Sequence, residues 1–431
     1  DVGLRMLRVL TGARESILAD IGPNTVIFSK RLLPSDTVHF TKRQPLAIVT
    51  EEGGPNAHAA LIAKAMGIPS ISSATVSPRI VPDGTEVIAD GYTGRIIVNP
   101  TAEEKSGFEA KRAAVRKSKR NVLRQTKHRT LKTGGREPVT VGANVASGGE
   151  IETAVRLGAD GIGLYRVEPV YMLAKSIPDE EHLHREINGS LEPAAGLPIV
   201  MRLADLGGDK TLPYLNLGHE HSSLLGLRGI RLLLKHTGLL RTQVRVFMRL
   251  ATRYDIRILV PMVTTPEDMR AVRAVLREEE QRLRQKGVDF EAGVPVGAML
   301  ETPCAAMEAD SVMDHCDFVS IGSNDLIQYL TAADRESSSV SGYYKHGRQP
   351  ALTLIGRIAK ETNRRGMSCS LCGELAGNTE YTRALLDAGV RNFSVSSPLV
   401  PTLKDYIHHL TAAPRKKQRR NATRSGAESS A

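Results

Sequence analysis

The chain has 431 residues, of which 41 % are hydrophobic and 24 % charged, as in ordinary globular proteins, and it is long enough for more than one domain. No apolar run reaches the ~18 residues that span a bilayer, and the four cysteines form no dense framework, so we expect a cytoplasmic protein that does not enter a membrane. The net charge is +11, but without tryptophan and with only 4 % aromatic residues the sequence does not favour nucleic acid as a partner.

The first hundred residues alternate short apolar runs with turn residues. Strands are expected at 25–30, 45–50, 86–91 and 95–100, and an alanine-rich helix follows the glycine pair at 53–54. The segment 101–133 has a helical, polar and basic pattern, which is typical of a helix that connects domains. We therefore expect an α/β domain over 1–100 and a linker helix within 101–136.

The pattern from residue 137 to 413 is that of short strands alternating with amphipathic helices. Eight strands are expected, at 139–144, 161–166, 199–205, 257–263, 296–301, 318–322, 368–373 and 392–396. Eight such units predict a (β/α)8 TIM-like barrel, and the alternative is an open doubly wound sheet. The segment 414–431 is basic and lacks a run of apolar residues, so we expect a disordered tail.

Polar side chains follow the expected barrel strands at their carboxyl ends, where barrel enzymes build their active sites. They are Asn144, Arg166, Arg202, Glu301, Asn324, Asp325, Cys372 and Glu374. Ion pairs with neighbouring acids would explain a single arginine. Three arginines near one mouth, Arg166, Arg202 and Arg228, favour a carboxylate or phosphate ligand.

Glu301 and Asp325 follow consecutive strands and offer hard oxygen ligands. Two carboxylates suit Mg²⁺, which leaves its other positions to water and an anionic substrate. Cys369 and Cys372 formally make a Cys-x-x-Cys motif, but within a strand this odd spacing points them to opposite faces. Cys372 is better explained as a proton donor or acceptor at the mouth.

His58 lies in "GGPNAH", at the expected start of the alanine-rich helix. Unpaired N–H groups and the helix dipole favour an anion there, so a phosphate carried on His58 would be stabilised. A structural histidine at the helix start explains the pattern equally well.

These segments together resemble a known family. "GGPNAHAALIAKAMGIPSI" is similar to the phosphohistidine motif of the phosphoenolpyruvate (PEP)-utilising enzymes. The segments "MRLADLGGDKTLPYL", "LLGLRGIR", "VGAMLETPCAAMEAD", "VSIGSNDLIQYLTAADR" and "LCGELAGN" resemble Enzyme I of the sugar phosphotransferase system. The resemblance extends from residue 1 to about residue 410 and implies a swivelling phosphohistidine domain followed by a PEP-binding barrel.

The resemblance also implies a role for each residue at a matching position. His58 corresponds to the phosphorylated histidine, with Thr37 in contact, and Cys372 to the acid that protonates the enolate. Arg166, Arg202, Arg228, Arg335 and Asn324 correspond to residues that bind PEP, and Glu301 and Asp325 to the Mg²⁺ ligands. The implied activity is that of a PEP–protein phosphotransferase acting on a phosphocarrier such as HPr, and the implied assembly is a homodimer through the barrel.

The sequence departs from the family at several positions. Asn56 and Ala57 stand where hydroxyl or thiol side chains are common, and Ser337 stands where the family has asparagine. The helical domain that docks HPr is expected to be absent from this chain. Two alternatives to the phosphotransferase are a relative of pyruvate phosphate dikinase or PEP synthase, which need an ATP-binding domain, and a regulatory protein that only binds PEP.

Overall fold

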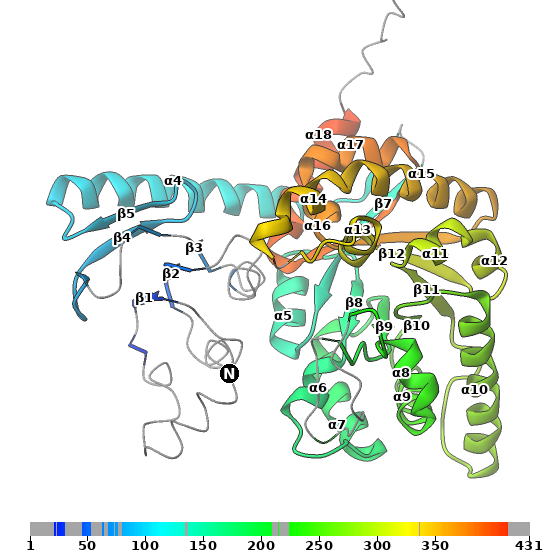
Figure 1. Ribbon diagram of the computed structural model, residues 1–431. Coiled ribbons are helices and arrows are strands. Elements are labelled where there is room, and N and C mark those ends of the chain that lie inside the picture. Colours follow the sequence, from blue (N-terminus) through cyan, green and yellow to red (C-terminus); the bar gives the residue numbers. More distant parts are fainter. Residues whose placement is uncertain are drawn as a thin grey trace, which may run out of the picture.

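The computed structural model describes residues 21–22, 24–30, 45–52, 63, 68–72, 74–75, 80–133, 137–208, 214, 224–335 and 337–412 (Figure 1). His58 and Thr37 lie outside the described residues, as do Asn56 and Ala57. The same holds for the expected tail and, apart from Ala63, for the helix expected after the glycine pair.

The N-terminal region contains two small sheets. β1 (Val26–Ser29), β2 (Ala47–Thr50) and β3 (Ser70–Ile71) pair in parallel, and β4 (Val87–Asp90) and β5 (Arg95–Val98) form an antiparallel hairpin. Isoleucine side chains supply most of a small core, which comprises Ile21, Ile27, Ile48, Ala63 and Ile68. The four strands expected here are confirmed with shorter bounds, and β3 was not expected because it is only two residues long.

The long helix α4 (Ala102–Thr126) begins at a capping box, in which the Glu104 N–H donates to Thr101 Oγ1 and the Thr101 N–H donates to Glu104 Oε2. The prediction that residues 101–133 are helical is wrong for the last residues of this segment, because α4 ends at Thr126. Residues Leu131–Thr133 form a strand, β6, which pairs with the start of β7 (Glu137–Val145) and buries Leu131. Burial against the barrel therefore overrides the helical pattern of this polar segment. At its far end α4 contacts α18 (Val400–Ala412).

The C-terminal region is a closed barrel of eight parallel strands. Each strand pairs with the next along the chain, and β14 pairs with β7 to close the ring, which excludes the open sheet. The strands are β7 (Glu137–Val145), β8 (Ile162–Arg166), β9 (Ile199–Arg202), β10 (Ile256–Val260), β11 (Val296–Leu300), β12 (Phe318–Gly322), β13 (Ser368–Cys372) and β14 (Asn392–Ser396).

Helices surround this barrel and bury the outward side chains of its strands (Figure 1). They are α5 (Gly148–Arg156), α6 (Glu168–Leu173), α7 (Glu180–Leu191), α8 (Ile230–Lys235), α9 (Thr237–Leu250), α10 (Pro266–Gln285), α11 (Pro303–Met307), α12 (Ala309–Met313), α13 (Ser323–Thr331), α14 (Ser341–His346), α15 (Arg348–Arg364), α16 (Glu374–Gly377), α17 (Thr379–Asp387) and α18. Among the described residues, no helix is both long and apolar enough to cross a membrane.

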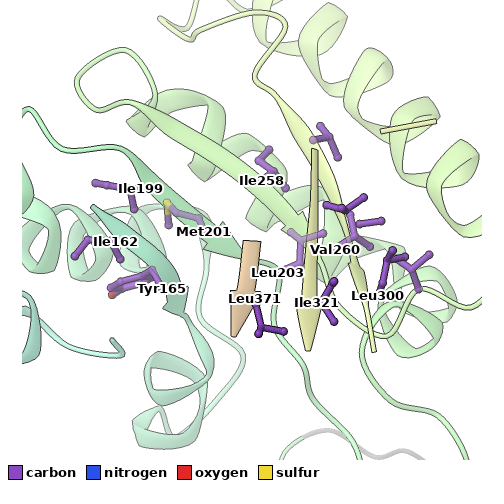
Figure 2. Close-up of a cluster of buried hydrophobic side chains, with 14 of the residues drawn as sticks. Ile162, Tyr165, Ile199, Met201, Leu203, Ile258, Val260, Leu300, Ile321 and Leu371 are labelled. Carbon is purple, nitrogen blue, oxygen red and sulfur yellow. The ribbon is translucent and has the colours of Figure 1, made fainter. Parts of the chain in front are cut away.

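Two apolar layers hold the barrel together. Figure 2 shows part of the larger one, in which strand residues such as Ile258, Val260, Leu300 and Ile321 form a continuous cluster with residues of the surrounding helices. A smaller cluster joins strands on opposite sides of the ring and so fills its interior: Leu164, Leu259, Met299, Phe318 and Cys372. A filled interior leaves ligand chemistry to the ends of the strands.

Charged side chains join three of the outer helices. Glu279 of α10 is 1 % exposed and accepts from Arg241 Nη1 (2.6 Å) and Arg245 Nη1 (2.7 Å), both on α9. Arg245 Nε also donates to Glu180 of α7, at 2.7 Å. Burial would raise the pKa of Glu279, but the hydrogen bonds from the two arginines outweigh it and the pKa is lowered. The stability from this carboxylate is therefore present above its unfolded pKa and lost as the pH falls.

We expect Glu279→Ala to lower the free energy of unfolding by about 2 to 3 kcal/mol, because it leaves two half-buried guanidiniums without their shared partner. Glu278→Ala is the matched control. Glu278 also pairs with Arg241, but its side chain is 56 % exposed, so we expect a cost below about 1 kcal/mol. Urea unfolding at pH 7 measures both, and equal losses would contradict a special role for the buried carboxylate.

Candidate active site

The parallel barrel brings the expected polar residues to one mouth. Arg166 and Arg202 are the last residues of β8 and β9 and are paired in register. Glu301 directly follows β11, Asp325 lies in the first turn of α13 after β12, and Cys372 ends β13. Arg228 and Arg335 come from segments outside the strands. Because all carboxyl ends of the strands lie on the same face, these groups share one site.

A chain of buried ion pairs connects the arginines at this mouth. Arg202 Nη2 donates to Glu168 Oε1 at 2.6 Å, and Arg202 Nη1 lies 3.6 Å from Asp205 Oδ2. Asp205, which is 1 % exposed, also accepts from Arg228 Nε and Nη2, both at 3.0 Å. Asp205 therefore links two arginines through one carboxylate, and its fork-on-fork contact fixes the plane of the Arg228 guanidinium.

The chain continues across the mouth from Arg228. Its Nη1 donates to Asp325 Oδ1 and to the Tyr329 hydroxyl, both at 3.0 Å, and Arg335 Nη1 lies 3.6 Å from Asp325 Oδ2. Burial disfavours the charged form of Arg202 and Arg228, but the neighbouring carboxylates outweigh it and hold both pKa values above their ordinary range. Both guanidiniums are therefore permanently charged. Arg202 and Arg228 therefore form ion pairs with neighbouring acids, which is the alternative to an anionic ligand that the sequence left open.

Several buried polar atoms at the mouth have no hydrogen-bond partner among the described residues. They include Arg166 Nε, Arg202 Nε and Glu301 Oε2. An unsatisfied buried donor or acceptor costs about 1 to 3 kcal/mol, so each is suited to a ligand that completes it. The arginine nitrogens suit an anion, and the glutamate oxygen suits a cation.

Glu301 is fully buried, and its Oε1 accepts the Met262 N–H at 2.7 Å. Met262 has a φ of 57°, an uncommon conformation for a side chain of this size, and it aims this N–H at the carboxylate. Burial, followed by the nearby charges of Asp325 and Asp205, raises the pKa of Glu301 to about 8. In the described part of the chain no three acidic, cysteine or histidine side chains form a metal cluster.

Cys372 lies at the inner end of the site. Its side chain is buried, and Sγ lies 3.4 Å from the Ile321 carbonyl oxygen, so the thiol points across to β12. Burial, together with the charge of Glu301, raises the pKa of Cys372 to about 12, so it stays protonated at neutral pH. Cys369 belongs to the outer core cluster and Cys372 to the interior cluster, which confirms that the two thiols point to opposite faces.

Two asparagine side chains at the mouth join neighbouring strands of the barrel by hydrogen bonds. Asn324 Oδ1 accepts the Glu374 N–H at 2.8 Å and so joins the ends of β12 and β13. This requires a glycine at position 373, where φ is 92° and an added Cβ would lie 2.7 Å from that oxygen. Asn144 exchanges two hydrogen bonds with Ser394 of β14, at 3.1 and 2.5 Å. Asn144 therefore ties β7 to β14.

Comparisons with known proteins agree with this architecture. Residues 119–412 match the family model "PEP-utilising enzyme, PEP-binding domain", and residues 21–94 match "PEP-utilising enzyme, mobile domain". The chain belongs to the PEP-utilising enzyme family. The first match covers the barrel and the second covers β1 to β4 of the N-terminal sheets, in the order that the sequence predicted.

Curated members of the family resemble the chain over nearly all its length. It is 34 % identical to a phosphoenolpyruvate-protein phosphotransferase of Priestia megaterium, over 96 % of the chain and 72 % of the relative. The proteins of the same name from Enterococcus faecalis and Geobacillus stearothermophilus are 35 % and 36 % identical, over 95 % and 92 % of the chain and 72 % and 68 % of the relative.

Sequence reasoning missed two acids of the site of this PEP-utilising enzyme. Neither Glu168 nor Asp205 is among the predicted site residues, although they follow Arg166 and Arg202 by two and three residues. Their position could have indicated a role in the site, because both acids come just after barrel strands, as the predicted site residues do. A buried arginine needs a carboxylate partner even when no ligand is bound, and the sequence does not show which arginines are buried.

Proposed function

We propose that this PEP-utilising enzyme is a phosphoenolpyruvate–protein phosphotransferase, which moves the phosphoryl group of PEP to His58 and releases pyruvate. The observation that carries the proposal is the chain of buried arginines at the barrel mouth, with unsatisfied nitrogens on Arg166 and Arg202. The names of the relatives support it. The domain limits 1–100, 101–136 and 137–413 belong to the proposal, with His58 in the first region and the PEP site in the third.

In the proposed reaction, the arginines neutralise and orient the substrate. Arg166, Arg202, Arg228 and Arg335 bind its phosphate and carboxylate, with Asn324 as a further contact, because phosphoryl transfer depends on positioning and charge more than on covalent activation. A ring nitrogen of neutral His58 attacks phosphorus, an N–P bond forms, and the bond from phosphorus to the enol oxygen breaks. The enolate carbon takes its proton from the Cys372 thiol, which solvent then reprotonates. Thr37 contacts His58.

A divalent cation fits the charges of this site. Three of the four arginines at the mouth are paired with the carboxylates of Glu168, Asp205 and Asp325. Glu301, with its pKa raised to about 8, is mostly protonated at neutral pH, so four arginines and three carboxylates leave a small positive excess before substrate enters. PEP brings about three negative charges, and Mg²⁺ would compensate for part of them. Glu301 would hold the ion through its unsatisfied Oε2, with Asp325 as the second ligand. When bound, the ion supplies positive charge to the phosphate and enolate oxygens.

The proposal extends to partners and location. We expect the phosphoryl group to pass from His58 to an HPr-like phosphocarrier. We also expect a homodimer through the barrel and a cytoplasmic location. A role in sugar transport would follow from the identity of the carrier.

Incubation with ³²P-labelled PEP and Mg²⁺ tests the proposal. We expect acid-labile label, release of pyruvate in equal amount, and a phosphorylated peptide that contains His58 in mass spectrometry. Label on another residue would contradict the assignment of His58. Labelling from γ- or β-labelled ATP alone would favour the dikinase or synthase alternative, and tight PEP binding without pyruvate release would favour a regulatory protein.

A further inference from the structure

A cavity of about 780 Å³ lies far from the barrel mouth, between α4 and the N-terminal sheets. One face of α4 forms a wall, and the strand β4 with the start of β2 forms the opposite side. Figure 1 shows α4 lying along the β4–β5 hairpin. No residue placed in the PEP site lines this cavity, so its chemistry is separate from the proposed reaction.

The cavity has more cations than acids. Two of its acids are already paired. Glu86, just before β4, pairs with Lys105 at 2.5 Å, and Asp90, the last residue of β4, pairs with Lys111 at 2.6 Å. Five lining cations (Lys105, Lys111, Arg112, Arg116, Lys119) face three lining acids (Glu86, Asp90, Glu109), which leaves an excess of two positive charges.

Two of these cations are available to a ligand. Arg112 and Arg116 lie one turn apart on the face of α4 that lines the cavity, and both are exposed. Within the described part of the chain neither has a carboxylate within 4.0 Å, although the cavity itself contains Glu109. Lys119 follows at the next turn, where its ammonium lies 5.9 Å from the centre of the Tyr92 ring.

Apolar and aromatic surface completes the lining. Phe108 and Val115 lie on the same face of α4 as the two arginines and are only half-buried. Leu46 is 40 % exposed and Tyr92 is 74 % exposed, which is high for side chains of this kind beside a helix. The cavity therefore combines an incompletely covered apolar floor with a row of cations at helical spacing.

We propose that this cavity binds a small organic polyanion, of the class of nucleoside di- and triphosphates, with its phosphates on Arg112 and Arg116 and its ring system against Tyr92 and Phe108. The volume lies in the range of small-molecule sites, roughly 300 to 1,000 Å³. Planar guanidiniums bind phosphate in bidentate fashion, and aromatic rings stack on the faces of bases. The concave apolar floor favours such a ligand over a membrane surface, which would need a broad convex patch.

Titration calorimetry of the whole chain with GTP, without Mg²⁺, tests the proposal. We expect saturable one-to-one binding with a Kd below 1 mM. Guanosine supplies only the ring system and tripolyphosphate only the charge, so each should bind at least tenfold more weakly than GTP. Failure of GTP to saturate at millimolar concentration would overturn the proposal, as would tripolyphosphate binding as tightly as GTP.

Two double variants distinguish binding in the cavity from non-specific attraction of GTP to the positive charge of α4. Arg112→Ala with Arg116→Ala should weaken GTP binding at least tenfold, and alanine at exposed helix positions preserves α4. Lys117→Ala with Arg120→Ala removes the same charge from exposed positions of α4 that do not line the cavity, and should change the Kd less than twofold. Equal weakening by both doubles would show non-specific attraction and overturn the proposal. Labelling by PEP should persist in both.

Discussion

Asp205→Asn is expected to lower kcat/KM for PEP-dependent phosphorylation by about 10²- to 10³-fold, because misplacing charged groups at a phosphoryl-transfer site has effects of this size. Asp205 accepts two hydrogen bonds from Arg228 and lies 3.6 Å from Arg202. Asparagine has nearly the same shape as aspartate, but it carries no charge, and its amide nitrogen cannot accept a hydrogen bond from Arg228. Among the described residues, Arg228 then keeps only Asp325 as an acid partner, and its guanidinium loses its fixed plane.

An ion pair with one buried partner, away from the mouth, supplies the control for this variant. Asp160, at the opposite end of the barrel, pairs with Lys404, whose side chain is fully buried, and accepts the Val141 N–H at 2.8 Å. We expect Asp160→Asn to destabilise the barrel while KM for PEP and kcat stay near those of the parent protein. For Asp205→Asn we expect KM to rise together with the fall in kcat. Steady-state kinetics and thermal unfolding of both variants decide the question, and similar kinetics would leave Asp205 with a purely structural role.

Glu301→Gln is expected to lower kcat by about 10³-fold or more and to remove the response to Mg²⁺, because it deletes a carboxylate that would hold the ion. The amide oxygen of glutamine can still accept the Met262 N–H, so the loop geometry should survive. The raised pKa of Glu301 means that the metal-free protein loses stability as the pH rises from the unfolded value towards 8. The glutamine variant lacks this ionisation, so at pH 8 and without metal we expect it to be at least as stable as the parent.

Binding of the ion can be measured apart from turnover. Mg²⁺ should raise the melting temperature of the parent protein in the presence of PEP and leave that of Glu301→Gln unchanged. Glu308→Gln changes an exposed glutamate near the start of α12 and should behave as the parent does. A Glu301→Gln variant that keeps its Mg²⁺ response would contradict the assignment of Glu301 as a ligand.

Much of the barrel can be read from the sequence because its strands are short apolar runs that end in polar residues. Arg166 and Arg202 end β8 and β9 as expected, and Cys372 ends β13. The main error among the predicted elements is the end of the long helix, which was expected to continue to residue 133 but ends at Thr126. The segment 131–133 has no local signal that distinguishes it from the basic helix, and it becomes strand β6 only because β7 offers a partner.

The sequence by itself determined the class of this protein, the order of its strands and the chemical types of residue at the barrel mouth. These follow from periodicity and from the parallel arrangement, which places every carboxyl end on one face. His58 remains a prediction from sequence alone. Only the tertiary structure decided that Glu168 and Asp205 hold Arg202 and Arg228, that Glu301 keeps an unsatisfied oxygen, and that α4 leaves a basic cavity beside the hairpin. The physical reason is that ion pairing and burial depend on distances between residues far apart in the chain, which no local pattern records.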